Sequence, residues 1–131
     1  MTTFALIATY QVWENYGAHA WDGEGECPQY WKAKGGEEVI VCENLTLKDV
    51  TSLSSDDLRR MVENAAPTND DFFTHDLIDY ELVELSDSLI QKVKDFQESE
   101  KFDPYLHRDA YGVSFDLGIT EYAAKWALER I

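Results

Sequence analysis

The sequence predicts an α+β domain: a small, mostly antiparallel sheet of three to four strands, with about three helices packed on one of its faces. Two observations favour this class. Segments with period-two apolar alternation cluster in the first third of the chain, and segments with helical periodicity follow, in the order β-β-β-α-β-α-α. With 44% hydrophobic residues, the chain can also bury a real core despite its charge. No repeat or linker divides it, so we expect one domain over residues 1–131.

The first strand is predicted over residues 3–13, with apolar side chains on both faces, which is typical of a central strand. Residues 14–29 are rich in glycine and predict a long loop. A short strand over 30–34 and a second over 37–43 follow, and Gly35-Gly36 between them predicts a hairpin turn.

Residues 44–54 predict a connection or a short helical turn, and Ser54 opens a helix with Asp57 in a capping-box position. A further strand is predicted over 75–85. Its core-facing side chains are expected to be Ile78, Tyr80 and Leu82, and its outward-facing ones Asp79 and Glu81.

Ser86 is expected to cap the next helix, whose apolar face is formed by Leu89, Val93 and Phe96. Residues 102–118 contain a proline and two glycines and predict irregular structure. A last helix is predicted over 119–131.

Charge is the most informative global property. Twenty-six acidic residues against eleven basic ones give a net charge of −15. Such a surface repels nucleic acid and anionic membranes and attracts basic partners. We therefore expect no direct nucleic-acid partner and no membrane partner. The alternative is that the charge serves solubility alone.

The acidic residues are concentrated between Arg60 and Lys92, a window without lysine or arginine. On a strand, Asp79 and Glu81 project from one face roughly 6.6 Å apart, comparable to successive phosphates along a nucleic-acid strand. Such a row could imitate DNA for a DNA-binding protein; the alternative is a solvated face that prevents edge aggregation. The predicted acidic partner-binding residues are Asp70, Asp71, Asp76, Asp79, Glu81, Glu84 and Asp87.

The segment 10–36 holds three of the four tryptophans and is either a loop folded over the core or a recognition surface. Trp13 and Trp31 are expected in the core, and Trp21 on the surface. Aromatic groups interleaved with acids favour protein binding. The residues predicted to contact a partner in this aromatic loop are Glu14, Asn15, Tyr16, Trp21, Tyr30 and Lys32.

Signals for chemistry are weak. No pair of histidines or cysteines has metal-ligand spacing, so no metal site and no cofactor are predicted. Neither a phosphate-binding glycine loop nor a nucleophile elbow is present. No catalytic residue is assigned and an enzyme is not expected, although a nucleophilic Cys27 paired with a histidine stays open. Cys27 and Cys42 fit free thiols, and a disulfide between them also stays open.

The runs ENYG (Glu14–Gly17) and PQYWKAKGG (Pro28–Gly36) resemble small acidic, uncharacterised proteins of tailed bacteriophages and mobile elements. The resemblance implies a bacterial cytoplasmic setting during infection. It also implies action by binding host proteins, including restriction and CRISPR nucleases. The absence of a basic segment before FALIA agrees with a cytoplasmic protein without a signal peptide or anchor.

The leading hypothesis is an acidic interaction protein, phage-encoded, that binds and inhibits a basic, nucleic-acid-handling host protein, in the manner of anti-restriction, anti-CRISPR or DNA-mimic proteins. The alternative is a protein that binds a small ligand or a nucleotide, or an enzyme that acts on one, with its pocket under the 14–36 loop. In that alternative the contacts are Lys32, Lys34, Tyr30 and Asn15. A homodimer is compatible with both.

Overall fold

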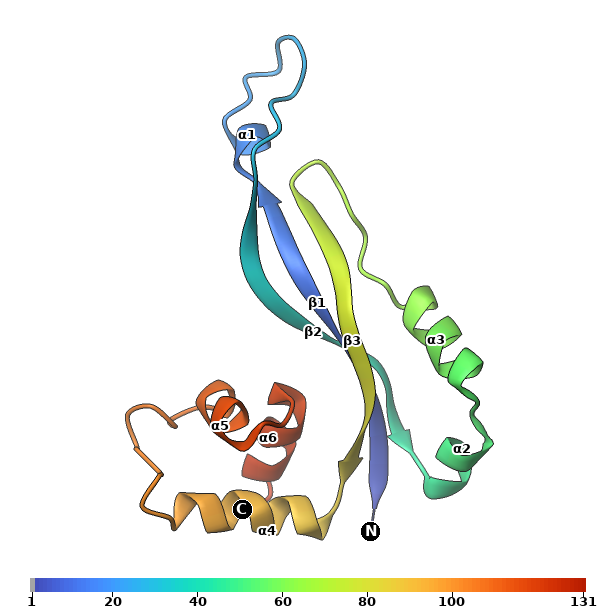
Figure 1. Ribbon diagram of the computed structural model, residues 1–131, viewed down its shortest axis with the longest axis vertical. Coiled ribbons are helices and arrows are strands. Elements are labelled where there is room, and N and C mark those ends of the chain that lie inside the picture. The colour runs from blue at the N-terminus through green and yellow to red at the C-terminus, as the bar shows by residue number, and fades with distance from the viewer. Residues whose placement is uncertain (1) are drawn as a thin grey trace.

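The structure is a computed structural model that describes residues 2–131. Its frame is a three-stranded antiparallel sheet in the order β2-β1-β3. The strands are β1 (Thr3–Asn15), β2 (Trp31–Leu45) and β3 (Phe73–Leu85). They form a long twisted ribbon along the molecule (Figure 1). The predicted α+β class with an antiparallel sheet is confirmed, as is the central position of the first strand.

Helices lie on both sides of this sheet, so the expectation that they cover one face is wrong (Figure 1). On one side α4 (Asp87–Gln97), α5 (Ala110–Leu117) and α6 (Glu121–Leu128) gather at one end of the ribbon. On the other side lie α2 (Leu47–Ser52) and α3 (Ser55–Asn64). None of the helices in residues 2–131 is long and apolar enough to cross a membrane.

The alternation of β1 explains why both faces need cover. Ala5 and Ile7 pack with Leu85 and with Ala123 of α6 on one face. Leu6, Ala8 and Tyr10 pack on the other face, where Val62 of α3 covers them. A separate apolar cluster holds α4, α5 and α6 together through the buried residues Val93, Phe96, Val113, Ala124 and Ala127. Because β1 is apolar on both faces, helices on a single face would leave half of its side chains in water.

The predicted hairpin turn at Gly35-Gly36 is wrong, because β2 is one continuous strand from Trp31 to Leu45. The register shifts by one residue at this point: Val12 pairs with Gly35, whereas Trp13 pairs with Ala33. Gly35 has a φ of 139°, which favours glycine, so it serves a bulge within the strand. The reversal between the strands is made instead by residues 16–30, which include the short helix α1 (Tyr16–His19).

Strand β3 contains a second register shift. Thr9 pairs with Asp79 and Tyr10 with Leu77, which leaves Ile78 as an extra residue. Ile78 is 60% exposed, so the prediction that it faces the core is wrong. Tyr80 and Leu82 do pack against the core cluster beneath α3, as predicted.

The helix starts are set locally and agree with the sequence. The Ser54 hydroxyl accepts from the Asp57 N–H, and the Asp57 carboxylate accepts from the Ser54 N–H, which confirms the capping box. The helix after Ser86 also begins where predicted, although the Ser86 side chain makes no capping hydrogen bond. Residues 102–118 are not wholly irregular, since they contain α5, which is capped by Asp109.

Candidate functional site

Three of the predicted acidic residues share one face of the sheet. They lie opposite alternate residues of β1, in the pairs Glu81 with Ile7, Asp79 with Thr9 and Asp76 with Gln11. Directly paired residues of antiparallel strands point to the same side, so these three carboxylates form a row, here called the acidic row. The extra residue Ile78 is what brings Asp76 into it, because strict alternation would put Asp76 on the opposite face from Asp79.

The acidic row is open to solvent, and all three residues are exposed. It runs away from the end of the sheet that α4, α5 and α6 cover (Figure 1). Its members are spaced by roughly 6.6 Å, from a rise of about 3.3 Å per residue. One oxygen of Asp76 accepts a hydrogen bond of 2.9 Å from the Trp13 indole N–H. This bond fixes the first carboxylate of the row.

The other predicted acidic residues do not belong to this row, so the seven do not form one surface. Glu84 pairs with Phe4 and lies on the opposite face, and Asp87 begins α4. Asp70 and Asp71 lie in the loop before β3. The Asp70 carboxylate accepts the N–H groups of Phe73 and Phe72, which lowers its pKa. Its role is to shape the turn.

The aromatic loop is organised by Asn15, which is completely buried. The Asn15 side-chain oxygen accepts from Gly17 N–H at 3.1 Å and from Tyr30 N–H at 2.9 Å. The side-chain nitrogen donates to the Asp71 carbonyl at 3.1 Å. Asn15 therefore joins both ends of the loop to the segment just before β3. This buried position does not fit the predicted contact with a partner.

Above Asn15, the loop from Ala20 to Gln29 projects beyond the end of the sheet and covers no core (Figure 1). Trp21 is 40% exposed, as predicted, and its indole N–H donates to the Glu24 carbonyl at 3.1 Å. Trp13 and Trp31 are residues of β1 and β2, and both are half-buried rather than in the core. The loop is thus a projecting tip whose one aromatic side chain, Trp21, is partly exposed to water.

The base of this tip carries a connected aromatic surface. The Lys32 ammonium lies 5.1 Å from the Tyr30 ring centre and 5.8 Å from that of Tyr16, within cation–π range. The Glu14 carboxylate beside Tyr16 raises the pKa of its hydroxyl and contacts His19 at 3.1 Å. The structure therefore brings together four predicted residues, namely Glu14, Tyr16, Tyr30 and Lys32. We call these four the aromatic base.

A groove of about 590 Å³ lies between β2 and α6, and sequence reasoning missed it. Three hydrogen bonds link its two walls: Glu38 accepts the first N–H groups of α6, from Glu121 and Tyr122, and Tyr122 OH donates to Glu43 at 2.5 Å. Burial, and then the Glu43 carboxylate, raise the pKa of Tyr122 to about 12. Its walls come from segments about eighty residues apart in the sequence, which sequence patterns do not bring together. The only signal in the sequence was that the last helix carries aromatic and charged side chains.

The residues of the alternative ligand site do not converge on a pocket under the loop. A smaller hollow of about 260 Å³ lies at the β2 bulge, lined by Val12, Lys34, Gly35, Gly36 and Glu37. Of the four predicted ligand contacts, Lys34 alone lines it. Asn15 is buried and bonded, and Tyr30 is exposed on the aromatic base.

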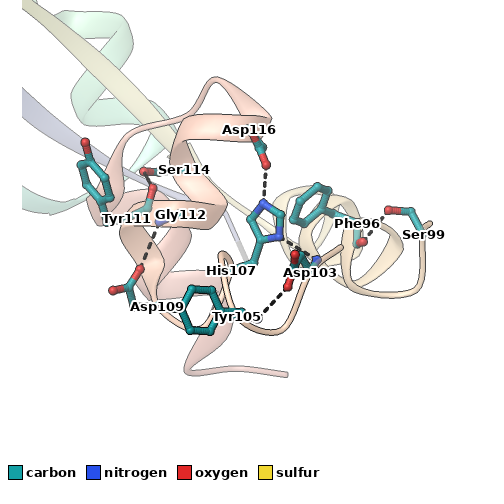
Figure 2. Close-up of polar contacts among 10 residues, drawn as sticks. All are labelled: Phe96, Ser99, Asp103, Tyr105, His107, Asp109, Tyr111, Gly112, Ser114 and Asp116. Carbon is teal, nitrogen blue, oxygen red and sulfur yellow. Dashed lines mark hydrogen bonds and ion pairs between the residues drawn. The ribbon is translucent and has the colours of Figure 1, made fainter. Parts of the chain in front are cut away.

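His107 is buried and braces the chain between α4 and α5 (Figure 2). Its Nδ1 accepts from the Asp103 N–H at 2.8 Å, so Nε2 carries the proton and donates to the Asp116 carboxylate. The ring stacks on Phe102 and meets Phe96 edge-on. Gly112 lets α5 approach the backbone next to His107, because a Cβ there would lie 2.1 Å from the Leu106 carbonyl oxygen. A histidine bonded to a carboxylate resembles a catalytic pair. Here, however, both ring nitrogens of His107 are used to hold the segment between α4 and α5 in place.

Metal and thiol chemistry gain no support within residues 2–131. Three or more metal-ligating side chains do not gather at any point there, and Cys27 and Cys42 are both free thiols. Cys27 lies in the projecting tip, and its sulfur donates a 3.7 Å hydrogen bond to the neighbouring Pro28 carbonyl. Comparison with protein-family models, with curated proteins and with solved structures finds no match to this chain.

Proposed function

We propose that this protein is an acidic interaction protein that binds the basic, nucleic-acid-binding groove of a partner and thereby blocks it. The observation that carries the proposal is the acidic row of Asp76, Asp79 and Glu81. It offers three regularly spaced carboxylates on an exposed strand in a chain of net charge −15. A groove built to hold a phosphate backbone presents lysine and arginine at similar intervals.

The aromatic base is a second surface at the same end of the sheet, and its members Glu14 and Lys32 point to the face opposite the acidic row. The Trp13–Asp76 hydrogen bond joins β1 to the first carboxylate of the row, and Asn15 follows two residues later at the foot of the tip. Exposed tyrosines supply contact area at low entropic cost, and carboxylates supply steering. A partner that covered both surfaces would gain specificity from the aromatic groups and speed of association from the charge.

The proposed target is a host DNA-binding enzyme such as a restriction or CRISPR nuclease, in a bacterial cytoplasm during phage infection. This choice rests on the resemblance of the segments Glu14–Gly17 and Pro28–Gly36 described above. The ligand-binding alternative has less support, because the tip projects beyond the sheet (Figure 1) and contributes no residue to the lining of either hollow described above.

The test is capture of partners from bacterial lysate on the immobilised protein, with washes of rising salt concentration. The row variant Asp76→Asn/Asp79→Asn/Glu81→Gln removes three charges and keeps the acceptor for Trp13. The control Glu63→Gln/Glu98→Gln/Glu100→Gln removes three exposed charges on and beside α3 and α4. We expect a DNA-binding protein that the wild type and the control retain at low salt and release at high salt, and that the row variant does not retain. Equal retention by the row variant would contradict the proposal.

A further inference from the structure

We propose that the groove between β2 and α6 binds an arginine side chain presented by an extended segment of a partner protein. This is a separate surface from the acidic row, and the proposal does not depend on the function proposed above. The residues lining the groove are Glu38, Ile40, Glu43, Asn44, Leu85, Glu121, Tyr122, Lys125, Trp126, Glu129 and Arg130.

The lining combines the two features that a guanidinium group prefers, a flat aromatic wall and carboxylates beside it. Trp126 and Tyr122 come from α6, and Ile40, which is 50% exposed, adds an apolar wall on β2. Four glutamates against one lysine and one arginine leave the lining acidic. Arginine can stack on such a wall while it donates to a carboxylate, which the compact, strongly hydrated lysine ammonium does less well.

The protein itself provides an example of the stacking, although not of the bond to a carboxylate. The guanidinium carbon of Arg130 lies 4.2 Å from the Trp126 ring centre, and its Nη1 donates to the Trp126 carbonyl at 2.9 Å. Arg130 is exposed and lies beyond Leu128, the last residue of α6, so it can leave the ring at small cost. We infer that it occupies the place of the partner's arginine and competes with it.

Hydrogen bonds between β2 and α6 also hold the two walls of the groove in place. Glu38 binds two N–H groups at the start of α6, and Tyr122 OH donates to Oε1 of Glu43. These bonds fix the distance between the walls before any partner arrives, which lowers the entropy lost on binding. Within residues 2–131, Oε2 of Glu43 and the carboxylate of Glu129 accept no hydrogen bond, so both are available to a guanidinium.

The test uses the full chain and the peptide acetyl-Ala-Arg-Ala-Arg-Ala-amide, titrated at low salt and followed by the tryptophan indole resonances. Trp126→Phe assigns the indole signal of Trp126. Two further peptides carry lysine, or citrulline as a neutral isostere of arginine. We expect the Trp126 signal to shift with the arginine peptide, at least fivefold more weakly with the lysine peptide, and not with the citrulline peptide.

Variants of the groove then locate the site. Glu43→Gln/Glu129→Gln should weaken binding at least fivefold, whereas the charge-matched Glu63→Gln/Glu100→Gln should leave it within about twofold of the wild type. Arg130→Ala should tighten binding about threefold, because the competitor is removed; a merely structural role of Arg130 would not do this. Binding by the row variant should be unchanged. The proposal is overturned if the Trp126 signal does not move up to millimolar peptide, if citrulline serves as well as arginine, or if the groove variant and its control behave alike.

Discussion

The indole N–H of Trp13 donates a 2.9 Å hydrogen bond to Oδ2 of Asp76, across the β1–β3 pair. This contact requires both side chains to lie on the same face, and the extra residue Ile78 makes that possible. An irregularity in the strand therefore decides how many carboxylates the open face presents. Bulges commonly reorient side chains next to functional surfaces, and here the bulge converts two aligned acids into three.

The β2 bulge should be sensitive to glycine substitution at one position and not at the next. Gly35→Ala places a Cβ at a φ of 139° and should cost about 1–3 kcal/mol of unfolding free energy. Gly36→Ala is the matched control, because its Cβ would approach nothing closer than 3.9 Å and its φ is ordinary. Urea denaturation measures both. Equal losses for the two variants would mean that the bulge does not depend on Gly35.

Asn15→Ala should loosen the tip. It removes three hydrogen bonds of a completely buried side chain. The Asp71 carbonyl and the N–H groups of Gly17 and Tyr30 then lose this partner. We expect a loss of about 2–4 kcal/mol. The control Gln29→Ala removes an exposed side chain that bonds only the Cys27 carbonyl and the Trp31 indole N–H. Hydrogen exchange should show faster exchange of the Tyr30 amide in the Asn15 variant alone; slow exchange there would refute the assigned role.

Replacement of His107 should destabilise the C-terminal helices. His107→Ala leaves the Asp103 N–H unpaired and opens a cavity between Phe96 and Phe102, with an expected cost of about 2–4 kcal/mol. Asp116→Asn should cost less, because the amide oxygen still accepts from Nε2. Thermal unfolding of the two variants and the wild type gives the ranking. If Asp116→Asn proves the costlier change, the hydrogen bond to the carboxylate rather than the buried ring holds this region.

Tyr122 links stability to alkaline pH. Its pKa is about 12 in the folded protein, above the ordinary value of 10. A raised folded pKa contributes stability below pH 10, and this contribution is lost as the pH rises from 10 to 12. The wild type should therefore lose stability more steeply over this range than Tyr122→Phe, as measured by urea unfolding at a series of pH values. Parallel curves would show that Tyr122 ionises normally.

Features that depend on neighbouring residues could be predicted from the sequence. The capping box of Ser54 and Asp57 is one, and the central position of β1 is another, because apolar residues on both of its faces need cover from both sides. Helix α5 was not predicted, because Pro104 and two glycines favoured irregular structure over residues 102–118. Asp109 before it, and Gly118 after it with a φ of 66°, are cap signals that could have located it.

Features that depend on pairing between distant segments could not be predicted. Gly35-Gly36 has the composition of a turn, and only its pairing with β1 shows that it lies within a strand. Ile78 fits the alternation of a core residue until the register shift is known. Alternation along one strand correctly placed Asp79 and Glu81 on the same face. That Asp76 joins them and Glu84 does not follows only from the pairing of β3 with β1.

The central claim is that the acidic row occupies a DNA-binding groove, and competition with DNA tests it most directly. The measurement is the fluorescence anisotropy of a labelled DNA duplex bound to the captured partner, as the protein is added. The wild type and the Glu63→Gln/Glu98→Gln/Glu100→Gln control should displace the duplex at similar concentrations. The row variant should need at least tenfold more, which corresponds to about 1.4 kcal/mol. Displacement by the row variant at the wild-type concentration, or a ternary complex that keeps the duplex bound, would contradict the account.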